Sequence, residues 1–166
     1  MNKLRTAIIL GLFSLTMFSA CSPLATTKSS GVQTGQVVKV ELFGYVWGQQ
    51  QGPARKAVVV PSDDNREIID ELVRMFVDVP VGRLDSGTDT KVVGCDALAV
   101  RYHMDNGTTV DVTRIFIGYH DVVVIWPDGT ATHTEWGAPS LVDYYSQFGT
   151  VSDVDIADIP EAQLPT

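Results

Sequence analysis

The chain has 166 residues, of which 12 are basic and 20 are acidic, and its formal net charge is −8. This length is enough for one domain with a hydrophobic core of its own. The acidic balance argues against nucleic acid or an anionic lipid surface as a partner, because both bind basic protein faces.

The first 22 residues, MNKLRTAIILGLFSLTMFSACS, have the layout of a secretory signal. Lys3 and Arg5 make the start positive, an apolar run follows from Ala7 to Phe18, and small residues precede Cys21. The apolar run is shorter than the ~20 residues that a membrane-spanning helix needs. The stretch therefore predicts a cleaved signal.

This stretch resembles the signal of bacterial lipoproteins, whose lipobox ends in an obligatory cysteine. The resemblance implies cleavage between Ala20 and Cys21, a lipid on the Cys21 thiol, and acylation by fatty acids such as palmitate. Two or more acyl chains give stable anchoring. The implied location is the extracytoplasmic face of the cell membrane. Phe18 departs from the lipobox, which usually has an aliphatic residue there, so a soluble secreted protein is the alternative.

After cleavage the chain has 10 basic and 20 acidic residues and a net charge of −10. Its composition divides it into three parts. The lipidated cysteine and a flexible tether rich in Ser, Thr and Gly span residues 21–35. A folded domain spans residues 36–149. An acidic tail, either disordered or extended along the domain, spans residues 150–166. Cys95 has no cysteine partner once Cys21 carries lipid, so no internal disulfide is expected.

The patterns within the domain predict strands and helices in a definite order. Alternating β-branched and aromatic residues, separated by short turns, predict six strands, over residues 37–47, 56–60, 97–104, 108–117, 122–126 and 130–136. Apolar residues at helical spacing predict a helix before Pro80, and a second helix is expected over residues 139–148. The predicted fold class is α+β: an antiparallel sheet of about five or six strands, with two helices packed on one face, in the order ββαββββα.

Motifs that carry chemistry are scarce. The sequence has no H-x-H, H-E-x-x-H, C-x-x-C or G-x-S-x-G pattern and no phosphate-binding glycine loop. No catalytic residue, cofactor or metal site is therefore predicted. A metal site from His103 and His133 would require them to meet across neighbouring strands and to find a third ligand. Paired catalytic carboxylates that come from different strands cannot be recognised by their spacing in the sequence. The sequence therefore neither supports nor excludes an enzyme.

Tyr45 and Trp47 are the candidate ligand contacts. They lie beside the Gly/Gln-rich turn over residues 48–52. Exposed aromatic residues near a hairpin tip are common contact points. The alternative is that both side chains pack in the core under the helices.

The predicted function is that of a membrane-anchored lipoprotein whose extracytoplasmic domain is a binding or interaction module of the cell envelope. Its partners would be the membrane, through lipid on Cys21, and an envelope protein that the sequence does not identify; nucleic acid is not among them. Two alternatives stay open. One is a small hydrolase of envelope material, and the other is an inhibitor protein that occupies an envelope enzyme.

Overall fold

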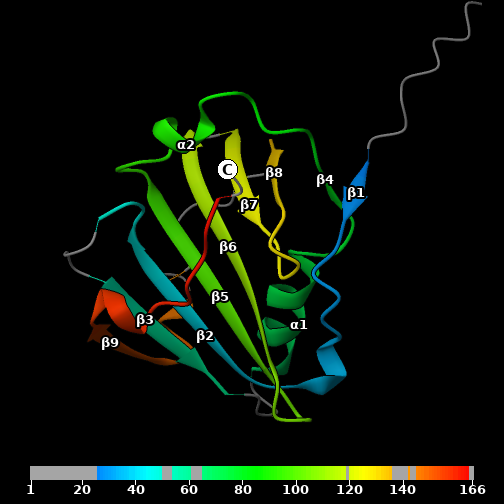
Figure 1. Cartoon of the computed structure of the whole chain (residues 1–166). Helices are drawn as coiled ribbons and strands as arrows, with labels where there is room; N and C mark the ends of the chain where they lie inside the picture. The colour runs from blue at the N-terminus through cyan, green and yellow to red at the C-terminus, as the bar shows by residue number, and fades with distance from the viewer. Residues whose placement is uncertain are drawn as a thin grey trace, which may run out of the picture.

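Long runs of β-branched and aromatic residues give this chain a sheet as its main element. The structure, a computed structural model, describes residues 26–49, 54–60, 65–118, 120–135, 142 and 145–164. Seven strands pair antiparallel in the order β8-β7-β6-β5-β2-β3-β9, as Figure 1 shows. They are β2 (Val37–Val46), β3 (Ala54–Val59), β5 (Asp96–Met104), β6 (Thr109–Gly118), β7 (Asp121–Ile125), β8 (Ala131–Thr134) and β9 (Thr150–Val154).

The sheet joins two units that are separate in the sequence. The β2–β3 hairpin and the β5–β8 meander follow chain order, and they meet where β2 pairs with β5, for example at Val40 and Tyr102. The prediction of an α+β fold with an antiparallel sheet is confirmed. The sheet has seven strands instead of five or six, because β9 adds to the outer edge of β3.

Helix α1 (Arg66–Arg74) covers one face of the sheet. Its apolar stripe, the one predicted from the sequence, is buried in the main hydrophobic core: Ile68, Ile69, Leu72, Val73 and, just beyond the helix, Phe76. The Tyr102 hydroxyl of β5 donates a hydrogen bond of 2.8 Å to the Leu72 carbonyl oxygen, which fixes α1 against the centre of the sheet.

The prediction of two helices on one face is met only in part. Half of the second predicted helix, over residues 139–148, lies outside the described residues, although Val142 and Tyr145 are buried in the core on the α1 side. The structure also has a short helix α2 (Thr88–Lys91) in a segment whose glycines predict a loop. Val92, which follows α2, packs on the opposite face of the sheet.

The opposite face of the sheet has an apolar half and a polar half. The apolar half is a second hydrophobic cluster, in which Ile115 and Val123 are fully buried and Ala97 nearly so. Residues 155–164, the C-terminal segment, cross this face, and their Ala162 and Leu164 pack on the apolar half. Figure 1 shows the C-terminal segment running across the sheet. The polar half lies beside the β5–β6 hairpin.

The two segments that flank the predicted domain both contain paired strands. In the segment predicted as a tether, β1 (Thr27–Lys28) pairs with β4 (Val79–Pro80), η1 (Thr34–Gln36) leads into β2, and Val32 is buried. In the segment predicted as a tail, β9 is followed by the one-turn helix η2 (Ile156–Asp158). Both segments bury isolated apolar side chains that show no periodicity. Among the described residues, no helix combines the length and apolar character needed to cross a membrane.

Candidate functional site

The polar half of the sheet face collects charged side chains from four strands. Side chains alternate between the two faces along a strand, so Lys39 and Glu41 of β2 share this face. The register places Glu41 opposite Arg101 of β5, and Arg101 opposite Asp111 of β6. Six side chains define what we name the charged cluster: Lys39, Glu41, Lys56, Arg101, His103 and Asp111.

Glu41 lies at the centre of the charged cluster, and its side chain is only 8% exposed. Its Oε1 atom lies 2.7 Å from Lys56 Nζ and 3.2 Å from Lys39 Nζ. Its Oε2 atom lies 2.7 Å from His103 Nε2. A buried carboxylate needs such partners, because burial without them would cost several kcal/mol. Glu41 thereby links the side chains of β2, β3 and β5.

The surroundings of Glu41 change its acidity. Burial by itself raises the pKa of this carboxyl group, because it disfavours the charged form. Hydrogen bonds from Lys56, His103 and Lys39 act in the opposite direction and outweigh burial, so the pKa of Glu41 falls to about 2. The carboxylate is therefore ionised throughout the neutral range.

Arg101 and Asp111 form the second ion pair of the charged cluster. Arg101 Nε and Nη2 donate hydrogen bonds of 2.8 and 2.9 Å to the two carboxylate oxygens of Asp111. This two-bond geometry is the strong form of an arginine–carboxylate contact. It raises the pKa of Arg101 above its ordinary value. Lys56 makes a further contact, with its ammonium group 5.3 Å from the centre of the Phe43 ring.

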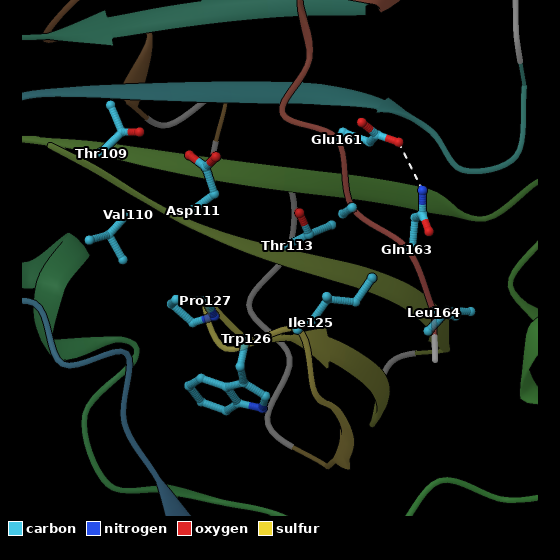
Figure 2. A pocket seen from close by; sticks show the side chains of 12 residues that line it. Thr109, Val110, Asp111, Thr113, Ile125, Trp126, Pro127, Glu161, Gln163 and Leu164 are labelled. Carbon is cyan, nitrogen blue, oxygen red and sulfur yellow. Dashed lines mark hydrogen bonds between the residues drawn. The ribbon is translucent and has the colours of Figure 1, made fainter. Parts of the chain in front are cut away.

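An open pocket of about 700 Å³ adjoins the charged cluster, between β6 and the C-terminal segment. Thr109, Asp111 and Thr113 of β6 line one side of it. Figure 2 shows Glu161 and Gln163 on the other side, where Gln163 Nε2 donates a hydrogen bond of 2.8 Å to Glu161 Oε1. The remaining wall is mainly apolar, with Ile125, Trp126, Pro127 and Leu164. The pocket lining thus combines hydroxyl, carboxylate and amide groups with apolar side chains.

Tyr45 and Trp47, the contacts predicted from the sequence, lie on the same face of the sheet at its apolar half. Both are half-buried against the second hydrophobic cluster, with ring centres 6.3 Å apart. Burial raises the pKa of Tyr45 to about 12, and its hydrogen bond with Thr113 acts in the opposite direction. Tyr45 therefore reaches across β5 to a residue that lines the pocket. The turn beside Trp47 includes residues 50–53, which lie outside the described residues.

Two of the histidines, His103 and His133, would form a metal site only if they met across neighbouring strands. His103 belongs to β5 and His133 to β8, and β6 and β7 separate these strands, so the two do not meet across neighbouring strands. His133 Nε2 instead lies 3.0 Å from Asp121 Oδ1. No group of three or more His, Cys, Asp or Glu side chains in the described part of the chain is placed to hold a metal ion. Cys21, the predicted lipidation site, lies outside the described residues.

Sequence reasoning did not identify the charged cluster. The alternation Lys39-x-Glu41 and Arg101-x-His103 indicates polar faces on two strands, and it is visible in the sequence. The missing information is that β2 and β5, which are about 60 residues apart, lie side by side. Without that pairing, each face resembles an ordinary solvent-exposed strand.

Comparison with known proteins gives no further guide to the site. No family model matches the chain, and neither does any curated protein or solved structure. A function for this chain therefore rests on its signal-like stretch, its fold and the side chains of the sheet face.

Proposed function

We propose that this chain is a membrane-anchored lipoprotein of the bacterial cell envelope, whose extracytoplasmic domain binds an envelope component at the polar half of the sheet. The signal-like stretch that ends at Cys21 supports the anchoring. The observation that carries the binding role is the pocket of about 700 Å³ beside the charged cluster.

The pocket has the character of a binding site. Ligand pockets usually measure about 300–1,000 Å³ and combine apolar walls with a few polar groups that orient the ligand. Here Thr109 and Gln163 offer neutral hydrogen-bonding groups, and Arg101 holds Asp111 in a fixed orientation. Such a lining suits a hydroxyl-rich or peptide-like ligand of the cell wall.

A small envelope hydrolase is the second candidate, because Asp111 and Glu161 both line the pocket. Two carboxylates that flank a bond are the usual equipment of glycoside hydrolysis. Both oxygens of Asp111, however, accept hydrogen bonds from Arg101, and Glu161 is held by Gln163. Both oxygens of Asp111 and one oxygen of Glu161 are thus already engaged by neighbouring side chains. Binding without conversion is therefore the better-supported function.

The test is amide NMR of the full-length chain in detergent micelles, with soluble fragments of cell-wall peptidoglycan as the probe. We expect the signals of Thr109, Asp111, Thr113 and Gln163 to shift, and those of the exposed face of α1 to stay unchanged. The substitution Thr109→Trp, at an exposed position of the pocket rim, should weaken binding at least tenfold by filling the pocket. Val60→Trp, at an exposed position elsewhere, is the matched control.

Two results would contradict the proposal. Cleavage of the fragments, detected by mass spectrometry and lost in Asp111→Asn, would establish the hydrolase instead. Shifts scattered over the surface, or equal binding by both tryptophan variants, would show that the pocket is not the site.

A further inference from the structure

The charged cluster holds more positive charge than its carboxylates neutralise. Lys39, Lys56 and Arg101 carry three permanent positive charges, and Glu41 and Asp111 carry two negative ones, before any proton on His103 is counted. This local excess stands out in a chain whose net charge is −8. Cations gathered around one carboxylate repel each other. A bound anion would relieve this repulsion.

The cationic side chains also have hydrogen-bond donors to spare. An ammonium group has three N–H donors and a guanidinium group has five. Among the described contacts, Lys39 and Lys56 each donate to Glu41, and Arg101 uses two donors on Asp111. The three side chains are 35%, 26% and 28% exposed, so their remaining donors are accessible from solvent.

We propose that Lys39, Lys56 and Arg101 form a binding site for one anionic group, a carboxylate or a phosphate, of a ligand whose uncharged remainder occupies the adjoining pocket. Glu41 is the positioning residue, since its buried carboxylate fixes the two ammonium groups before the ligand arrives. This inference rests on the proposed function and specifies its ligand class.

The negative side chains of the pocket limit the ligand further. Asp111 and Glu161 line the pocket, and they would repel a second negative charge placed there. The ligand therefore has its anionic group at the β2–β3 side of the site and a neutral, hydrogen-bonding body toward β6. A polyanion such as nucleic acid does not meet this requirement.

The experiment is a titration of the full-length chain in micelles with sodium phosphate and, separately, with sodium acetate. Ionic strength and pH are held constant by replacing sodium chloride. Amide and side-chain NMR signals of Lys39, Lys56 and Arg101 are followed. We expect saturable shifts at these residues and an affinity that falls about tenfold or more in Lys56→Met, because a hydrogen bond to a charged group is lost. Methionine keeps the apolar stem that contacts Phe43.

Lys91→Met removes an exposed lysine of α2 and is the matched control, which should bind as the wild type does. Lys39→Met repeats the test from another strand, should Lys56→Met fail to fold. Phosphate and acetate shifts that match those from chloride alone would overturn the anion site. Equal affinity for phosphate in Lys39→Met, Lys56→Met and the control Lys91→Met would overturn it as well. Peptidoglycan fragments that still bind in the pocket under those results would leave the proposed function standing. If phosphate binds and no peptidoglycan fragment does, the proposed function is contradicted and the anion site stands.

Discussion

At the scale of single residues, Glu41 has the largest influence on the polar half of the sheet. It is a carboxylate in mid-strand, almost without solvent, and its partners come from three strands. Removing the charge leaves Lys39 and Lys56 close together without their shared counter-ion. The cost of such an uncompensated charge exceeds the net worth of the original pair.

Glu41→Gln should therefore change the dependence of stability on pH. The pKa of Glu41 is about 2 in the folded chain and 4.5 in the ordinary carboxyl group. Because the folded value is the lower one, ionised Glu41 stabilises the fold above pH 4.5, and this contribution disappears as the pH falls from 4.5 toward 2. The partly exposed lysines weaken it by solvent screening. At pH 7 the variant should be less stable by about 1–3 kcal/mol.

The measurement is urea unfolding of the wild type and Glu41→Gln between pH 7 and pH 2. The difference between the two proteins should shrink as the pH falls. Glu71→Gln, at an exposed position of α1, should follow the wild type. If the free energy of unfolding of Glu41→Gln were below that of the wild type by the same amount at pH 2 as at pH 7, the lost stability would come from side-chain shape and not from charge.

At the scale of elements, helix α1 is the part that the sequence predicts best. Its stripe repeats at helical spacing, and the same five side chains are buried in the structure. The start of α1 is less predictable: the spacing of Asp64 and Glu67 indicates a capping box, whereas α1 begins after Asn65, and Asp64 lies outside the described residues. The side chain of Asn65 makes no capping hydrogen bond and instead donates to the Val60 carbonyl oxygen, a contact that residue spacing does not reveal.

Leu72 and Glu71 test the buried face of α1. Leu72 is fully buried, whereas Glu71 is exposed. Leu72→Ala should lower the free energy of unfolding by about 2–5 kcal/mol, through lost burial and the cavity left behind. Glu71→Ala should change it by less than about 0.5 kcal/mol. Thermal unfolding of both variants measures this, and equal losses would mean that α1 presents a different face to the sheet.

Strand β9 is the element that the sequence predicts worst. It contains Ser152 and Asp153 and lies in an acidic stretch, so its composition resembles a solvated tail. Two features that are apparent only in three dimensions explain it: Val151 packs against the main core, and the Gly149 backbone comes very close to Val58. The pairing of β2 with β5, which forms the charged cluster, is likewise apparent only in three dimensions.

Gly149→Ala should loosen β9. A Cβ atom at this position would collide with the backbone carbonyl of Val58, which cannot move aside without disturbing β3. We expect a loss of about 1–3 kcal/mol, as for other overpacked sites. Hydrogen exchange should become faster at residues 150–154. Gly35→Ala, which has open space at the Cβ position, is the control. Unchanged protection of β9 in Gly149→Ala would show that the close approach is not needed.

At the scale of the whole molecule, the domain and its proposed anchor are close in sequence. The structure describes the chain from Thr26 onward, five residues after Cys21. Five residues span at most about 18 Å when fully extended, so a lipid on Cys21 would hold the domain near the membrane surface. Figure 1 shows β1 near the top and the β5–β6 hairpin at the bottom. The charged cluster lies in the hairpin half of the sheet.

Metabolic labelling with radioactive palmitate tests the anchoring most directly. Cells that express the wild type, Cys21→Ala or Cys95→Ala are labelled, and the protein is recovered from membrane and soluble fractions. Cys95 is the second cysteine of the chain, so its variant controls for non-specific thiol acylation. We predict label and membrane association in the wild type and in Cys95→Ala, and loss of the label in Cys21→Ala. A wild type without label, or a Cys21→Ala variant that keeps it, would contradict a lipoprotein anchored through Cys21.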